Sequence, residues 1–356
     1  MSESVPVEYI VTRYFTKYNR LDSLIPYAFS GSKAKAINIY IDVYGLYKTL
    51  FSRSYRTSIN DYTSFTTSII NMCSHYRGYF KNIGVYAKIF IISSYNVPEA
   101  NCKFVAGYNK TMLEKLANKS INNMIDLNNQ LLDLLCPYLP NIHFISSSYE
   151  SSSVMDFLIR KEESEGNKNP NLIISSDIYP IQLTTKYSQT AFLRPKKSQG
   201  EDHSMIVCPK EHSTHHQSFW GLVCERDNLV NRSENIRISP VNFPLLMALN
   251  RFPERNITNL ININAIERII YDIVADQPLK VTAETIYSVS NELAAKVPFT
   301  VIDSRYKVLD IDYQSYLFDE SLESKMIKYE NLNDPDAVQL INSQYFSTNP
   351  IDVYRL

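Results

Sequence analysis

Three acidic residues stand where predicted β-strands end, and their type and placement point to cation chemistry. Asp42 ends a β-branched run, and Glu150 and Asp177 each follow a short apolar run. The carboxyl ends of neighbouring parallel strands meet at one edge of a sheet, so we expect these carboxylates to converge there. Carboxylate oxygens suit Mg²⁺, and two such ions can clamp the oxygens of a phosphodiester displacement. The competing interpretation is that each acid caps a helix or a turn.

The elements that position these acids alternate along the chain. Strands are predicted at Ile37–Val43, Val85–Ile92, Ile142–Ile145 and Leu172–Ile174, with helices at Asp61–Phe80, at Leu113–Leu135 and after Ser146–Ser148. This alternation predicts βαβ units and a central, mostly parallel sheet, which is an α/β fold.

The pattern changes after Thr184. Thr190–Arg194 and Met205–Cys208 predict a β-hairpin, and helices are expected at Phe243–Asn250, Asn264–Ala275 and Ala283–Ala295. Tyr306–Leu356 is acidic and Tyr-rich and has no clear periodicity. The expected organisation is an N-terminal extension (1–36), an α/β core (37–185), a hairpin insertion (186–237), a helical region (238–300) and an acidic tail (301–356).

A cysteine and histidine cluster falls in the predicted insertion. Four of its side chains could ligate zinc, but their spacing matches no standard zinc finger: Cys208, His212, His215 and Cys224. A polar loop with ordinary histidines is the interpretation that we favour, so no zinc is expected.

Composition narrows the functional classes. Residues 1–60 carry eight Lys and Arg against four Asp and Glu, whereas residues 301–356 carry five against ten. The basic N-terminal segment could form a surface that binds nucleic acid; the alternative is that the charges are scattered without a function. With only eight glycines and no glycine-rich phosphate loop, nucleotide hydrolysis is disfavoured. The 26 tyrosines suit an AT-rich genome such as that of a virus.

The expected compartment follows from the cysteines and the apolar runs. The five cysteines are odd in number and loosely spaced, which indicates reduced thiols. No apolar run reaches membrane-spanning length and no secretion signal is visible. We therefore expect a cytoplasmic protein, in the host cytoplasm or a virion if the source is viral, with no membrane partner.

Several short sequence motifs, called words below, occur in the same order along the chain as in the flap-endonuclease and 5′-3′ exonuclease (PIN-like) nucleases, which the chain therefore resembles. In Ser175–Leu183, the residues Asp177, Gln182 and Leu183 match the family word, but Tyr179 replaces its second acid. Glu150 matches the family's acidic word at a helix start, and Asp42 fits the first-strand aspartate.

Other positions of the same words depart from the family. Ser93, Ser152 and Ser153 stand where aspartates belong, and Arg255 stands at an expected aspartate ligand. The resemblance also implies nucleic-acid contacts at Tyr108 and Lys110 of the arch entrance and at Arg255 and Asn256 before a degenerate helix-hairpin-helix.

The resemblance implies a PIN-like fold whose metal site is vestigial. Asp42, Glu150 and Asp177 remain and could hold one Mg²⁺, but about five ligands are lost, so efficient two-metal hydrolysis is not expected. The predicted function is a catalytically inactive nuclease homologue that binds DNA or RNA or serves with protein partners in a larger assembly, such as that of a virus or phage. The alternative is a divergent Mg²⁺-dependent 5′ nuclease whose missing ligands lie elsewhere.

Overall fold

The structure is a computed structural model of the 356-residue chain. It describes residues 35–43, 61–94, 119–147, 149–175, 177, 179–187, 189–194, 205–207, 240–249, 280–315, 332, 334–346 and 351. The chain divides into two compact units. The sheet unit comprises the described residues of 35–94, 119–177 and 332–351, and the hairpin–helix unit comprises those of 179–315.

Four parallel strands form the centre of the sheet unit. They are β1 (Ala36–Asp42), β2 (Tyr86–Ser94), β3 (Ile142–Ser147) and β4 (Asn171–Ile174), arranged in the order β3-β2-β1-β4. All four are buried on both faces along most of their length, as expected for strands that helices cover on either side. The four strands that the sequence predicts are therefore confirmed, each within a few residues.

Two helices cover one face of this sheet. They are α4 (Asp61–Asn82) and α7 (Lys119–Leu135), which pack against each other and against the strands. Thr66 of α4 donates a buried hydrogen bond to Asn128 of α7 (2.7 Å), so the helix pair is joined by a polar contact as well as by apolar packing. The predicted start of the second helix, at Leu113, lies outside the described residues.

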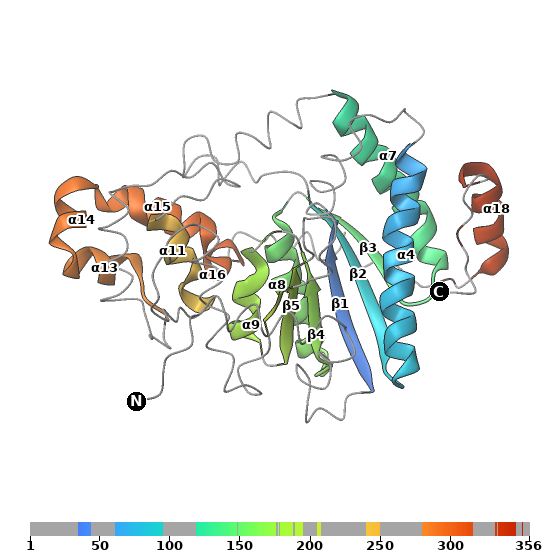
Figure 1. Cartoon of the computed structure of the whole chain (residues 1–356), viewed down its shortest axis with the longest axis horizontal. Coiled ribbons are helices and arrows are strands. Elements are labelled where there is room, and N and C mark those ends of the chain that lie inside the picture. The colour runs from blue at the N-terminus through green and yellow to red at the C-terminus, as the bar shows by residue number, and fades with distance from the viewer. Residues whose placement is uncertain are drawn as a thin grey trace, which may run out of the picture. The chain divides into compact units, whose positions relative to one another are not determined.

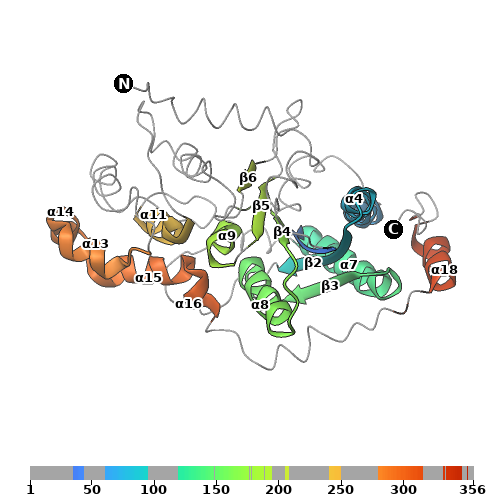
Figure 2. The same cartoon turned by 90° about the horizontal axis from the view of Figure 1, so that it is seen from below.

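The opposite face is covered by α8 (Ser151–Ser164), as Figure 2 shows for α4 and α8 on either side of β2. Lys88 of β2 forms an ion pair with Glu162 of α8 (2.6 Å) on this face. Helix α8 begins at the carboxyl edge of the strands and returns toward their amino ends. Its first turn therefore lies beside the edge where the predicted site belongs.

A last helix, α18 (Pro335–Tyr345), completes the sheet unit (Figure 1). Asp334 caps it by accepting hydrogen bonds from the N–H groups of Asp336 and Ala337. It packs on the short 3-10 helix η1 (Cys136–Tyr138), and the N–H of Leu332 donates to the carbonyl of Pro137 (2.8 Å). The C-terminal segment is thus an ordered part of this unit at these residues.

The hairpin–helix unit contains one antiparallel strand pair and a group of short helices. Strands β5 (Thr190–Arg194) and β6 (Met205–Val207) pair in the predicted hairpin. The other elements are η2 (Tyr179–Gln182), α9 (Leu183–Lys186), η5 (Pro240–Asn242), α11 (Phe243–Leu249), α13 (Ala283–Val289), α14 (Asn291–Lys296), α15 (Phe299–Leu309) and α16 (Ile311–Ser315). The fold class, an α/β domain with a mostly parallel sheet, a hairpin and a helical part, is confirmed.

Three local predictions are corrected. The single helix expected at Ala283–Ala295 is two helices, because the Ser290 side chain accepts from the Leu293 N–H and caps α14 instead of continuing α13. The serines expected to cap α8 do not; its N-cap is Glu150. Helices α15, α16 and α18 occupy part of the region that showed no periodicity.

No helix among the described residues combines the length and the apolar character needed to cross a membrane.

Candidate functional site

The strand ends bring Asp42 and Asp177 together through one hydroxyl group. Ile41 of β1 is in register with Ile174 of β4, so Asp42 and Ser175 follow as neighbours on the α8 face. The Ser175 hydroxyl donates to Oδ2 of Asp42 (2.6 Å) and accepts from the N–H of Asp177 (3.0 Å). Two of the three predicted acids thus share a contact within the sheet unit.

All three acids are buried. The exposed fractions are 1% for Asp42, 6% for Glu150 and 8% for Asp177. Burying a carboxylate is unfavourable unless hydrogen bonds or cations compensate its charge, so each of these acids depends on the polar groups around it. Yet within the described parts of the chain no three His, Cys, Asp or Glu side chains gather in an arrangement that could hold a metal ion.

The ends of β2 and β3 carry hydroxyl groups that bind protein atoms. Asp42 is in register with Ile92, so strand alternation places Ser94 on the face of Asp42 and Ser93 on the opposite face. Ser93 donates to Asn129 of α7 (2.8 Å). At this strand end the residue on the same face as Asp42 is therefore Ser94, and not Ser93, which the resemblance to the nuclease family had suggested.

Ser94 and Ser147 hold the turn that leads to the third acid. The Ser94 hydroxyl donates to the carbonyl of Tyr149, and the N–H of Tyr149 donates to the Ser147 hydroxyl (3.1 Å). These two residues are in register on β2 and β3. Their hydroxyl groups fix the backbone immediately before Glu150, and an ionised carboxylate could not replace Ser94 as the donor in this arrangement.

The first turn of α8 is polar and uncharged apart from Glu150. The carbonyl of Glu150 accepts from the N–H groups of Ser153 and Val154, while its side chain makes no capping bond. Ser152 and Ser153 are 1% and 2% exposed, and the Ser152 hydroxyl lacks a hydrogen-bond partner among the described residues. This turn contributes hydroxyl groups where the family word has acids.

Two further residues of the family word serve the hairpin–helix unit. The Tyr179 hydroxyl donates to the carbonyl of Val308 (3.2 Å). The Gln182 side chain donates to the carbonyl of Leu309 (2.9 Å) and accepts from the N–H of Ile311 (3.4 Å). Both side chains therefore hold the junction of α15 and α16, a role that the sequence did not indicate.

An aromatic row crosses three strands on the α8 face and was not predicted. Tyr40 stacks on Phe90 (5.0 Å between centroids), Phe90 stacks on His143 (5.3 Å), and the Lys88 ammonium lies over the Phe90 ring. Burial, with the positive charge of Lys88, lowers the pKa of His143 to about 4. The imidazole is thus neutral at physiological pH. No pattern in the sequence indicated this row, because the stacking depends on the register of β1, β2 and β3.

Two cysteines of the sheet unit are buried free thiols. Burial raises the pKa of Cys73 to about 12 and raises that of Cys136 well above its ordinary value. Thiols in this state are poor nucleophiles and poor metal ligands.

The remaining predicted site residues lie outside the described residues. They are the nucleic-acid contacts Tyr108, Lys110, Arg255 and Asn256 and the zinc candidates Cys208, His212, His215 and Cys224.

No protein-family model matches the chain, and no curated protein is significantly similar to it in sequence. Solved structures do match its fold. A bacteriophage T5 5′-exonuclease with bound divalent zinc ions has a TM-score of 0.50 at 11% identity, covering 88% of this chain and 99% of the phage protein. The catalytic core of Rad2 in complex with DNA substrate (TM-score 0.42, 11% identity) covers 88% of this chain and 87% of its own length.

Human GEN1 in complex with Holliday junction DNA is similar over 87% of this chain and 68% of its own length, with a TM-score of 0.44 and 9% identity. At these identities the comparison establishes the fold alone. The chain has the PIN-like fold of the flap-endonuclease and 5′-3′ exonuclease nucleases, as the sequence resemblance implied.

Proposed function

We propose that this chain is a nuclease-fold protein that binds DNA or RNA without hydrolysing it by a two-metal mechanism. The observation that carries the proposal is the bonding at the strand ends. There, the hydroxyl groups of Ser94, Ser147 and Ser175 bind protein atoms at positions around the remaining acids. A neutral hydroxyl is a weaker Mg²⁺ ligand than a carboxylate.

The electrostatic argument concerns the number of carboxylates. Two divalent ions bring four positive charges into a buried site, and several acids must compensate that charge. Asp42, Glu150 and Asp177 supply three negative charges at most. Among the expected ligands, Tyr179 donates its hydroxyl to a backbone carbonyl, and Ser152 and Ser153 are neutral. Binding of one Mg²⁺ by these three acids would require them to come closer together than they lie among the described residues.

Support for nucleic acid as the partner comes from the fold and from the charge of the N-terminal region. The T5 protein of similar fold is a 5′-exonuclease. The excess of Lys and Arg in residues 1–60 would neutralise phosphates, giving binding that depends on salt and little on sequence. Tyr108, Lys110, Arg255 and Asn256 remain the proposed contacts.

The test is a cleavage assay beside a binding titration. Labelled 5′-flap and nicked duplexes are incubated with the purified chain and Mg²⁺ or Mn²⁺, and binding of the same DNA is measured at several salt concentrations. We expect binding that weakens steeply with salt, and no cleavage. The Asp177→Ala variant is the matched control, and its binding should stay close to that of the wild-type chain.

Two other outcomes would overturn the proposal. Cleavage that Asp177→Ala abolishes would mean that ligands elsewhere in the chain complete an active Mg²⁺-dependent 5′ nuclease. Neither binding nor cleavage would favour a structural component of a larger, plausibly viral, assembly.

A further inference from the structure

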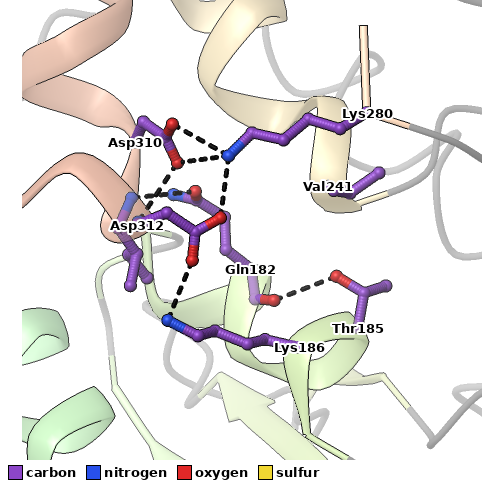
Figure 3. A pocket seen from close by; sticks show the side chains of 8 residues that line it. Gln182, Thr185, Lys186, Val241, Lys280, Asp310 and Asp312 are labelled. Atoms are coloured by element: carbon purple, nitrogen blue, oxygen red, sulfur yellow. Dashed lines mark hydrogen bonds and ion pairs between the residues drawn. The ribbon is translucent and has the colours of Figure 1, made fainter. Parts of the chain in front are cut away.

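The hairpin–helix unit contains a small pocket outside the strand-end site, and its lining includes two lysines and two aspartates. Its volume is about 100 Å³. Its lining, drawn in Figure 3, comes from η2, α9, η5, the chain before α13 and the junction of α15 and α16. The residues are Gln182, Thr185, Lys186, Val241, Lys280, Asp310, Ile311 and Asp312. Segments about 130 residues apart in sequence thus meet around two lysines and two aspartates.

Two of these charges form a fixed anchor. The Lys280 ammonium donates to both carboxylate oxygens of Asp310, at 2.9 and 2.8 Å. The Asp310 side chain is only 9% exposed and that of Lys280 is 28% exposed. A close pair with a buried carboxylate is costly to break, because either partner would be left uncompensated. Lys280 is therefore held at the pocket wall.

The other aspartate is held differently. Asp312 lies between the two lysines (Figure 3): its Oδ1 is 2.8 Å from Lys186 and its Oδ2 is 2.8 Å from Lys280. Its side chain is 51% exposed, and that of Lys186 is 29% exposed. Solvent screens the ion pairs of a half-exposed carboxylate, so Asp312 is held less firmly than the buried Asp310.

Asp312 is in its charged form at neutral pH, so its carboxylate can compete with an external anion for the two lysines. Burial alone would raise the pKa of its carboxyl group, but hydrogen bonds from Lys186 and Lys280 outweigh that and lower it below its ordinary value. At neutral pH Asp312 is an anion clamped between two cations, in the geometry in which an external anion would be bound.

We propose that this pocket is a phosphate-binding site in which the Asp312 carboxylate occupies the place of the ligand until a phosphate group displaces it. With Asp312 turned outward, Lys186, Lys280 and Asp310 leave a net charge of one positive unit facing the pocket. Two ammonium groups that converge on one carboxylate can instead converge on two phosphate oxygens, which carry more charge.

The phosphate has two sources that the same chemistry would accept. It can be part of a nucleic-acid strand, and this identification rests on the proposed function, or it can be free phosphate. A cation is disfavoured because both lysines face the same space. The volume of about 100 Å³ limits the group that enters the pocket to about one phosphate, so the rest of a strand would lie outside it.

The test uses two variants with opposite expected effects. Binding of inorganic phosphate to the full chain is measured by calorimetry. Asp312→Asn removes the competing charge and should tighten phosphate binding by about tenfold, whereas Lys186→Met should weaken it by about tenfold, each equivalent to about 1.4 kcal/mol. The matched controls are Asp303→Asn and Lys307→Met, an ion pair on α15 outside the pocket (2.7 Å), which should change neither.

The sign of the Asp312→Asn effect decides the proposal. A purely structural ion pair predicts no gain in phosphate affinity, so an unchanged or weaker affinity in this variant would overturn the site. A gain of affinity also cannot result from misfolding.

A second arm separates the two sources. Short single strands with and without a 5′-phosphate are titrated against the same variants at fixed salt. If the strand affinity rises in Asp312→Asn and falls in Lys186→Met, the pocket binds a phosphate of nucleic acid. If only the affinity for inorganic phosphate changes in this way and no strand binds, the pocket is a free-phosphate site and the proposed function fails. Strand binding indifferent to both variants, with no phosphate binding, rejects the pocket alone.

Discussion

At the scale of single residues, the Ser175 hydroxyl is the contact that joins the two buried acids at the strand ends. Replacing Ser175 by Ala removes a hydrogen bond to the carboxylate of Asp42 and another from the N–H of Asp177. Because a buried polar group that loses its partner is costly, we expect Ser175→Ala to lower the free energy of unfolding by about 1–3 kcal/mol. Urea denaturation followed by circular dichroism measures this.

The control for that change is Ser164→Ala at the exposed end of α8, where the serine hydroxyl donates to the carbonyl of Lys161. Surface substitutions of this kind usually stay within about 0.5 kcal/mol of the wild type. Equal effects of the two substitutions would show that the Ser175 bridge contributes nothing to the stability of the strand ends.

His143 predicts a specific dependence of stability on pH. Its pKa in the folded chain is about 4, below the ordinary 6.5, because burial and the charge of Lys88 disfavour protonation. Between these two values the unfolded chain binds more protons than the folded one, so this residue makes the protein less stable as the pH falls from about 6.5 to about 4. Above that window its contribution is constant.

The measurement compares urea denaturation at pH 7 and pH 5. The loss that His143 causes between these values should be about 1–2 kcal/mol and should be missing in His143→Gln. The matched control is His75→Gln on the exposed surface of α4, which should keep the full loss. A wild-type pH dependence in the His143 variant would mean that other groups cause it.

At the scale of elements, Gln182 ties η2 to the junction of α15 and α16. Gln182→Ala would leave the carbonyl of Leu309 and the N–H of Ile311 without these partners in a buried environment. We expect the free energy of unfolding to fall by about 2–4 kcal/mol, since two buried backbone groups lose hydrogen bonds.

Hydrogen exchange locates this effect. Amide protection should fall in α15 and α16 and stay unchanged in the strands of the sheet unit, because stability is distributed in local cooperative units. Gln339→Ala, at an exposed position of α18, is the control and should alter neither. Uniform loss of protection across both units would contradict a local role for Gln182.

Elements with strong local signals were predictable from the sequence. The β-branched runs gave the four parallel strands, and the periodicity of the first helix gave α4 nearly to its ends. The break at Ser290 was missed because a serine is tolerated within a helix, and only its side-chain bond to Leu293 shows that it caps a new one. Asp334 followed by Pro335 was an available start signal for α18.

The candidate site was predictable only in part. Asp42, Glu150 and Asp177 could be selected because acids that follow strands in an α/β chain have a common location. The side chain that faces them from β2 could not be chosen, since that depends on register, and the register places Ser94 rather than Ser93 on their face. The pocket around Asp312 needs contacts between residues far apart in sequence, which no local pattern encodes.

At the scale of the whole molecule, the serines at the strand ends lead us to expect that divalent cations hardly change the free energy of unfolding. A ligand that binds the folded chain alone stabilises it by mass action, by about 2.7 kcal/mol at a concentration one hundred times its dissociation constant. With three acids and hydroxyl groups that bind protein atoms, we expect about 5 mM Mg²⁺ to change the free energy of unfolding by less than about 0.5 kcal/mol relative to EDTA.

Restoring acids should reverse this behaviour. A variant with Ser94→Asp, Ser152→Asp and Ser153→Asp adds three negative charges to a buried edge, so it should be less stable than the wild type in EDTA. Mg²⁺ should then stabilise it by about 2–3 kcal/mol, because the cation compensates charges that repel one another. If instead Mg²⁺ stabilises the wild type to that extent and Asp177→Ala removes the effect, the native chain already has a working cation site. The serines would then be compatible with the metal-dependent nuclease that the proposed function sets aside.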